Sequence, residues 1–134
     1  MKLLSILSHE LTNEQKKELK EKYNVKCIVI LSEELMSYWS NIDPNSNIPN
    51  KNLFQIIDWI LNSSSEGDYV FIQGEYGSVY YLVDFCFSTN RVPIYSSSKR
   101  RVLENKEGEK VYSKRIFEHV KFKKYIKYEE RNYE

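Results

Sequence analysis

His9 is one of two histidines in the chain, and it lies between Ser8 and Glu10 in the segment "ILSHEL". An imidazole takes up and releases a proton near neutral pH, so a histidine at a strand end suits general acid–base chemistry. The structural alternative is that His9 hydrogen-bonds a backbone carbonyl and closes its own loop. The second histidine, His119, lies in the alternating segment "IFEHVKF", which predicts an ordinary strand residue. His9 is therefore the candidate for proton transfer.

A polar loop, "QGEYGS" at residues 73–78, separates a β-branched and aromatic run from an apolar helical pattern. Gly74 and Gly77 permit close backbone approach, and N–H groups at a helix N-terminus, including that of Ser78, suit a phosphate. Neither the G-x-G-x-x-G spacing nor a P-loop lysine is present. Glycines at a strand-to-helix turn also occur for steric reasons, so a phosphate-binding and a purely structural interpretation both stay open.

A third polar segment, "YSSSKRR" at residues 95–101, combines hydroxyl groups with cations. Ser97 and Ser98 offer donors, and Lys99 and Arg100 offer positive charge, which together match a phosphodiester. The alternative is a polar strand end that leads into a solvated hairpin.

Several motifs of metal-dependent and nucleophilic catalysis are absent from the sequence. It contains no H-E-x-x-H, no Cys/His cluster, no repeated Asp-x-Asp pattern and no G-x-S-x-G. Metal-dependent hydrolysis and a nucleophile-elbow esterase are therefore disfavoured. The prediction is metal-free and cofactor-free chemistry, or binding alone.

Alternating strand and helix patterns position these loops. Strands are predicted at residues 2–7, 25–31, 69–73 and 92–98. Helices are predicted from about residue 13, at 32–40, at about 51–61, and after the 73–78 loop, with Val79, Leu82, Val83 and Cys86 as the core face of the last one. A capping box at Thr12 to Gln15 marks the first helix start. This alternation predicts an α/β fold, a Rossmann-like and mostly parallel sheet flanked by helices. Ligands of such sheets collect beyond the carboxyl ends of the strands, where all three polar segments should meet.

The rest of the chain has a different pattern. Two β-like arms flank a turn signal at Asn105 to Gly108, so residues 99–126 are predicted to form a β-hairpin appended to the sheet or projecting from it. The expected organisation is one domain over residues 1–134, with an α/β core at 1–98, the hairpin at 99–126 and a tail at 127–134.

Composition narrows the class of protein. With 134 residues, 41% hydrophobic and 29% charged, the chain is large enough for one ordinary core, and no apolar run approaches the length of a membrane span. Cys27 and Cys86 lie in apolar segments far apart, which predicts two buried thiols of a cytoplasmic protein. Residues 1–90 hold 7 Lys/Arg against 12 Asp/Glu, and residues 91–134 hold 13 against 7. The basic second part is the one expected to face an anion, although a lysine-rich surface also serves solubility alone.

The order of several segments resembles a known family. "LLSILSHELTNEQKKELKEKYNV", "LSEELMSYWSNI", "GDYVFIQGEYGSVYYLVDFCF", "VPIYSSSKRRV" and "FEHVKFKKY" are similar to the Csx-twenty family of small accessory proteins associated with type III CRISPR systems. The resemblance covers the chain to about residue 126. It implies a Rossmann-like homodimer related to domains that sense cyclic oligoadenylates, and a ring nuclease that cleaves this second messenger to switch off antiviral signalling.

The resemblance also implies roles for the polar loops. The positions that match are Ser8, His9, Glu10, Gln73, Gly74, Gly77, Ser97, Ser98, Lys99 and Arg100, with serines where relatives have threonines in the last loop. A ribose 2′-OH would attack the adjacent phosphate without metal. His9 would move the proton, Lys99 or Arg100 would stabilise the developing charge, and Tyr76, Tyr80 or Tyr95 would stack on adenine.

Three functions stay open at the level of the sequence. The first is the ring nuclease, with cyclic tetra-adenylate as the expected ring. The second is a protein that binds and sequesters the ring without cutting it, which would not need His9. The third is an interaction module whose basic hairpin docks an effector subunit or RNA. Neither DNA nor a membrane is an expected partner.

Overall fold

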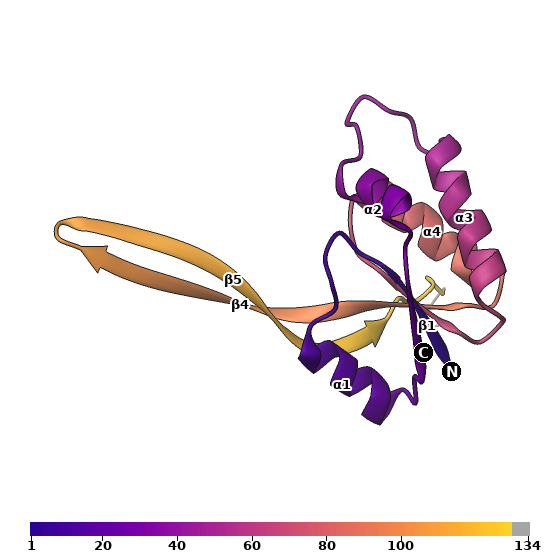
Figure 1. The fold of residues 1–134 in the computed structure, drawn as a ribbon, viewed down its shortest axis with the longest axis horizontal. Helices are drawn as coiled ribbons and strands as arrows, with labels where there is room; N and C mark the ends of the chain where they lie inside the picture. Colours follow the sequence, from indigo (N-terminus) through magenta and orange to yellow (C-terminus); the bar gives the residue numbers. More distant parts are fainter. Residues whose placement is uncertain (130–134) are drawn as a thin grey trace, which may run out of the picture.

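The computed structural model describes residues 1–129 and has alternating strands and helices. Their order is β1 (Lys2–Ile6), α1 (Asn13–Lys22), β2 (Cys27–Ile30), α2 (Glu33–Ser40), α3 (Lys51–Ser63), β3 (Tyr69–Ile72), α4 (Tyr76–Ser88), β4 (Val92–Glu107) and β5 (Lys110–Lys124). Every strand and helix expected from the sequence is present, with boundaries displaced by a few residues. The sheet and its helices are drawn in Figure 1.

A single sheet of five strands has the order β2-β1-β3-β4-β5. Strands β2, β1, β3 and β4 are parallel to one another, and β5 is antiparallel to β4. The α/β class, with a mostly parallel sheet and a C-terminal hairpin, is therefore confirmed.

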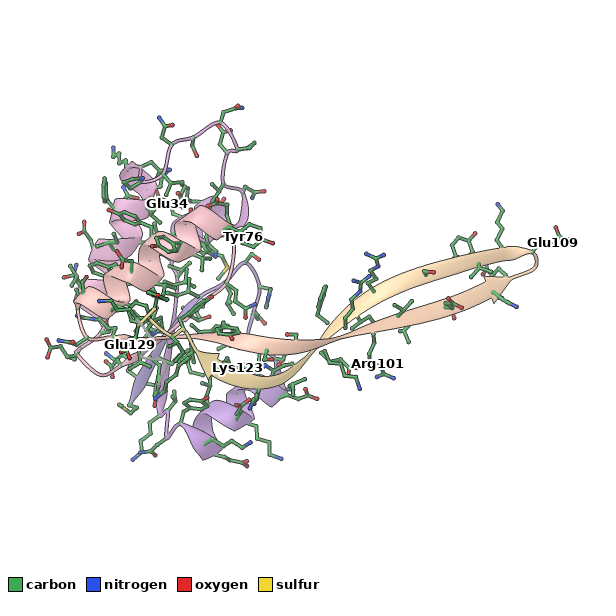
Figure 2. All side chains as sticks on the ribbon, turned by 180° about the vertical axis from the view of Figure 1, so that it is seen from behind. Glu34, Tyr76, Arg101, Glu109, Lys123 and Glu129 are labelled. Atoms are coloured by element: carbon green, nitrogen blue, oxygen red, sulfur yellow. The ribbon has the colours of Figure 1, made fainter. Side chains whose placement is uncertain are left out.

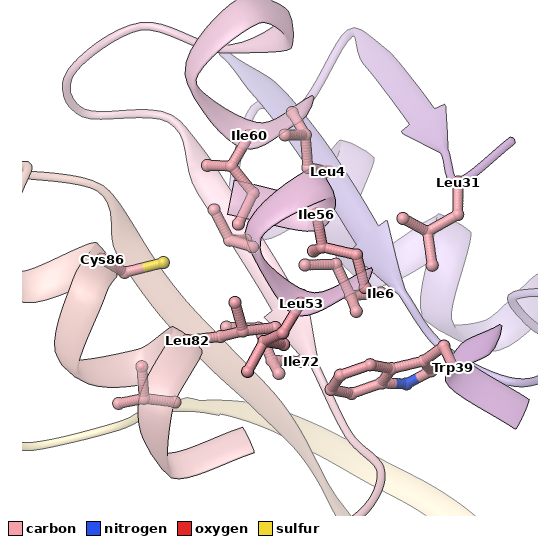
Figure 3. Packing of buried hydrophobic residues seen from close by; sticks show 12 residues of the cluster. Leu4, Ile6, Leu31, Trp39, Leu53, Ile56, Ile60, Ile72, Leu82 and Cys86 are labelled. Carbon is pink, nitrogen blue, oxygen red and sulfur yellow. The ribbon is translucent and has the colours of Figure 1, made fainter. Parts of the chain in front are cut away.

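Each face of the sheet has its own hydrophobic core. On one face α1 covers a cluster in which Leu19 packs with Leu3, Phe71 and Phe122. On the other, α2, α3 and α4 cover a larger cluster that includes Trp39 from α2. Figure 3 shows this second cluster, with Trp39 beside the residues of α3 and the sheet. The result is a three-layer arrangement with α1 alone on its side (Figure 1).

Local signals explain most of the helix boundaries. Thr12 caps α1, and its side chain exchanges hydrogen bonds with Gln15 as the capping box predicts. The sequence pattern predicts that α3 buries one stripe, made of Leu53, Ile57, Ile60 and Leu61, and the observed buried face is rotated from it. Ile56 is fully buried there, whereas Leu61 is 45% exposed. The helix packs on one side only, and that side follows i, i+3, i+7 spacing from Leu53 to Ile60.

The hairpin is longer and more continuous than expected. β4 runs unbroken from the sheet into the hairpin, and the turn lies at Gly108, whose φ is +62°. Figure 1 shows the distal part of β4 and β5 projecting from the body. Figure 2 shows Arg101 and Glu109 on this projection, while Lys123 lies back at the sheet. We call residues 99–118 the arm. Residues 130–134 of the expected tail lie outside the described residues.

The two cysteines differ in environment, which corrects one prediction. Cys86 of α4 is fully buried, as expected. Cys27 is exposed, because it begins β2, an edge strand whose two ends are uncovered. Within residues 1–129, no helix combines the length and the apolarity that crossing a bilayer requires.

We expect the two thiols to react at very different rates. Burial raises the pKa of the Cys86 thiol to about 12, so its reactive thiolate is scarce at neutral pH. Iodoacetamide at pH 8 should alkylate Cys27 and spare Cys86, as read by mass spectrometry of tryptic peptides. Equal labelling in the native protein would contradict the packing of α4, and labelling of both in denaturant is the control.

Candidate functional site

A cavity of about 500 Å³ opens on the α1 face, where the parallel strands end. Residues from five parts of the chain line it: the loop after β1, the start of α1, the end of β3, and strands β4 and β5. They are His9, Thr12, Gln15, Gln73, Ser96, Ser98, Phe117 and His119. Hydroxyl, amide and imidazole groups therefore converge where α/β sheets hold their ligands.

A chain of hydrogen-bonding groups leads from this cavity into the protein. Ser98 Oγ lies 3.3 Å from Ser96 Oγ, and Ser96 Oγ lies 2.5 Å from His119 Nδ1. His119 Nε2 lies 2.6 Å from Glu18 Oε1 of α1. A serine hydroxyl, a histidine ring and a carboxylate therefore follow one another in space, each at hydrogen-bonding distance from the next.

The two inner members of this chain are buried and fixed. The side chains of His119 and Glu18 are 5% and 10% exposed. Glu18 Oε2 accepts the backbone N–H of Phe122 at 2.9 Å, and the His119 ring packs against the Phe122 ring at 4.6 Å between centroids. An ionised carboxylate only accepts hydrogen bonds, so His119 Nε2 donates to Glu18. In the neutral imidazole, Nδ1 is then the acceptor that faces the Ser96 hydroxyl.

The end of β3 is tied to the neighbouring strand β4 and to helix α2. Gln73 Oε1 accepts the backbone N–H of Ser96 at 3.0 Å, which joins the β3 loop to β4. The Gln73 carbonyl accepts the Trp39 indole N–H at 2.9 Å. Gly74 follows directly, and a Cβ at this position would lie 2.7 Å from the Trp39 ring. The steric interpretation therefore accounts for Gly74.

Replacing Gly74 by Ala should destabilise the protein by about 1–3 kcal/mol, because Trp39 is buried and cannot move aside. Chemical denaturation followed by tryptophan fluorescence would measure the change. Gly77→Ala is the control, since an added Cβ there meets only the exposed Glu75 side chain at 3.2 Å. Equal stability of the two variants would contradict the close approach of Trp39.

The N-terminus of α4 already holds a negative group of the chain itself. Glu75 Oε1 accepts the N–H of Gly77 at 3.0 Å, and Glu75 Oε2 accepts the N–H of Ser78 at 2.8 Å. The pKa of the Glu75 carboxyl is lowered by the nearby Ser78 hydroxyl and then by the Ser78 and Gly77 N–H groups. The buried Ser78 hydroxyl has no hydrogen-bond partner among the described residues. The contacts of Glu75 with the Gly77 and Ser78 N–H groups therefore define the cap. A phosphate would have to displace Glu75 from these donors.

His9 closes its own loop and also borders the first cavity. Its Nδ1 lies 2.9 Å from the carbonyl oxygen of Glu10, so it does close the first loop. A carbonyl only accepts, which assigns the hydrogen to Nδ1 and leaves Nε2 for a ligand. His9 also lines the cavity, and its exposed ring is accessible.

A second cavity of about 590 Å³ adjoins His9 and lies between α1 and the β2 edge. It brings together three cations, Lys16, Lys20 and Lys26, with Glu10 beside them. His9 lines both cavities, so these lysines border a space that is continuous with its loop. The charge distribution along the sequence predicts cations for the site only from the basic second part of the chain, whereas these three lysines lie in the first part.

Strand alternation places the two predicted cations of β4 on different faces. In the pairing of β4 with β5, Arg100 lies opposite Phe117 and Ser98 lies opposite His119. Ser98, Phe117 and His119 line the first cavity. Residues i and i+2 share a face, as do cross-strand partners, so Arg100 lies on the cavity face. Lys99 lies on the opposite face, where its partner Glu118 forms an ion pair with Arg101 at 2.6 Å.

Other predicted residues are not among those that line the two cavities. Ser8 and Ser97 line neither of them. Tyr95 packs against Tyr125, with 4.8 Å between ring centroids. Tyr76 is 93% exposed and begins α4 on the face opposite α1 (Figure 2), so it is not beside the first cavity. Tyr80, one turn further along α4, is 76% exposed.

Sequence reasoning missed Glu18, Ser96 and the site role of His119. Glu18 is one of several charged residues in a solvent-facing helix pattern, and only the tertiary contact with β5 distinguishes it. His119 carried a weak signal, because a hairpin with its turn near Gly108 brings residue 119 beside Ser98. Among the described residues, no three His, Cys, Asp or Glu side chains form a group suited to a metal ion.

Comparisons with known proteins give one family. The model of the family described as Uncharacterized protein MJ1673 matches residues 1–123. The curated protein "Uncharacterized protein MJ1673" of Methanocaldococcus jannaschii is 33% identical over 127 residues, which covers 95% of this chain and 98% of the relative. No solved structure shows significant similarity to the chain.

Proposed function

Since the chain belongs to the family described as Uncharacterized protein MJ1673, we propose its function from its own site and from its resemblance to the Csx-twenty family. It binds a cyclic oligoadenylate, with cyclic tetra-adenylate as the expected ring, and cleaves it without a metal. This ring-nuclease activity would switch off type III CRISPR antiviral signalling in the cytoplasm.

The observation that carries the proposal is the polar cavity at the carboxyl ends of β1 and β3, beside residues 96–98 of β4. It joins His9, Gln73 and Ser98, one residue from each polar loop. Amide and hydroxyl groups suit the sugar and base edges of RNA, and a histidine suits transfer of a ribose proton.

The reaction needs no external nucleophile. The 2′-OH of one ribose attacks the neighbouring phosphate, the bond to the 5′ oxygen breaks, and a linear product with a 2′,3′-cyclic phosphate remains. His9 transfers a proton, and its exposed Nε2 side is directed by the contact of Nδ1 with Glu10. The protein supplies orientation and charge.

Positive charge for the phosphates comes from two sources. Lys16 and Lys20 line the cavity beside His9, and Arg100 lies on the cavity face of β4. Charge-assisted hydrogen bonds from these groups would hold the phosphate oxygens and stabilise the transition state. A homodimer would present the same loops to opposite phosphates of a two-fold ring.

Arg100→Ala should weaken binding of cyclic tetra-adenylate about 10–100-fold, because one charge-assisted contact contributes about 1.5–3 kcal/mol. Lys99→Ala is the matched control, since it removes the same charge from the adjacent residue on the opposite face. Isothermal titration calorimetry at fixed salt would measure both. Equal losses would mean that only general electrostatic attraction operates.

The direct test of the function incubates the purified protein with cyclic tetra-adenylate and cyclic hexa-adenylate in the presence of EDTA. Chromatography and mass spectrometry should show linear products with cyclic phosphate ends. Intact rings that remain bound to the protein would favour sequestration instead of cleavage. Intact and unbound rings would refute the proposal.

A second candidate, RNA or effector binding by the arm, is favoured by one specific observation. The arm projects from the body, and residues 99–118 hold 7 Lys/Arg against 4 Glu. If this is the function, single-stranded RNA should bind with strong salt dependence, and a variant in which residues 100–117 are replaced by a short turn should lose that binding. The same variant would also remove Phe117 from the cavity. Binding of cyclic tetra-adenylate and binding of single-stranded RNA should therefore be measured side by side.

A further inference from the structure

The buried chain of Ser96, His119 and Glu18 has the composition of a proton relay. Glu18 accepts the Nε2–H of His119 at 2.6 Å, and His119 Nδ1 accepts the Ser96 hydroxyl at 2.5 Å. Ser96 lines the cavity, so the relay reaches the space where a ligand would lie. The same order of hydroxyl, imidazole and carboxylate activates a hydroxyl group in other enzymes.

We infer that Ser96, His119 and Glu18 form the proton-accepting relay of this site, and that His9 is the separate proton donor. The inference rests on the proposed function and assigns the proton path within it. Ser96 is the catalytic residue that touches the substrate, His119 is the proton acceptor behind it, and Glu18 is a positioning residue.

The in-line geometry of the reaction requires two separate proton-transfer groups. The attacking 2′ oxygen and the leaving 5′ oxygen lie on opposite sides of the phosphorus atom, so one group cannot easily serve both. Two histidines line the same cavity, His9 from the loop after β1 and His119 from β5. This supplies a separate acid and base.

The step is balanced without a co-reactant. The ribose 2′-OH gives its proton to Ser96 Oγ while Ser96 gives its own proton to His119 Nδ1, and the new bond joins the 2′ oxygen to phosphorus. The bond from phosphorus to the 5′ oxygen breaks, and the 5′ oxygen takes the Nε2 proton of His9, which enters the step as the imidazolium and leaves it neutral with its Nδ1–H still on the Glu10 carbonyl. Solvent returns the two histidines to their starting states.

The structure makes the relay ready before a ligand arrives. Both Glu18 oxygens are occupied, one by His119 and the other by the Phe122 N–H, and the His119 ring is held against Phe122. The Ser96 backbone N–H is bound to Gln73. The imidazole and the serine are therefore fixed by contacts from α1, β3 and β5, as an efficient base requires.

A purely structural role for this cluster would tie α1 to β5 and would affect stability alone. Two variants separate the roles. Ser96→Ala removes the hydroxyl but keeps the contact between Glu18 and His119, so the protein should fold. His119→Ala removes the base and leaves a space that exogenous imidazole can enter.

The experiment measures single-turnover cleavage of cyclic tetra-adenylate, and ring binding and thermal unfolding are measured on the same samples. Ser96→Ala should lower the rate about 100-fold or more with less than about a threefold change in Kd. The single-turnover rate of His119→Ala should fall by a similar factor, and added imidazole should raise it again at least about tenfold. Ser113→Ala on the distal arm is the control variant.

Each outcome decides between the two proposals. If the wild type cleaves the ring but Ser96→Ala keeps its rate, the relay is wrong and the proposed function stands. If His119→Ala is stable but imidazole restores nothing, His119 is not the proton acceptor. If the wild type leaves the ring intact, the proposed function and the relay both fail.

Discussion

His9→Ala is expected to lower the single-turnover rate of ring cleavage about 10²–10⁴-fold, the range for loss of a positioned proton-transfer group. Binding should change little, because His9 is exposed and its one hydrogen bond joins it to the adjacent Glu10 carbonyl. The rate loss would therefore appear with Kd nearly constant. Rapid-quench kinetics with labelled cyclic tetra-adenylate would measure it.

Two controls make the His9 result specific. Lys17→Ala changes an exposed residue of α1 that lines neither cavity, and it should keep the wild-type rate. His9→Gln restores a hydrogen-bond donor near the Glu10 carbonyl but cannot donate a proton as an acid. If His9→Gln cleaves as fast as the wild type, His9 only closes its loop, which is the structural interpretation of this residue.

The sequence was sufficient for the architecture because the fold depends on patterns that are local. Alternating strand and helix periods, the capping box at Thr12 and the turn signal near Gly108 each act within a few residues. The α/β class and the C-terminal hairpin follow from them. The meeting of His9, Gln73 and Ser98 at one cavity then follows from the topology of parallel strands.

The rest of the site depends on contacts that no local pattern encodes. Glu18 and His119 are 101 residues apart in the chain, and they meet only because β5 returns along β4 and passes α1. The face on which a β4 side chain lies depends on the register with β5, which shifts between Ser97 and Ser98. Lys99 and Arg100 were consequently indistinguishable in the sequence, although the strand directs them to opposite faces.

Trp39→Ala is expected to be the most destabilising substitution considered, with a loss of about 3–5 kcal/mol in the free energy of unfolding. Trp39 is 3% exposed and belongs to the larger core cluster (Figure 3). Its removal leaves a cavity and also leaves the Gln73 carbonyl without its indole donor. Urea denaturation followed by circular dichroism would give the value.

The same tryptophan links the core to the site. It holds the Gln73 carbonyl, and Gln73 holds the Ser96 backbone through its side chain. Trp39→Phe retains most of the apolar volume but lacks the indole N–H, so it should cost less stability and still loosen Gln73. Phe54→Ala on α3, where the ring is 47% exposed, is the control and should cost less than about 1 kcal/mol. If Trp39→Phe binds cyclic tetra-adenylate as tightly as the wild type, the loop after β3 is held without the indole contact. The site would then be independent of this core residue.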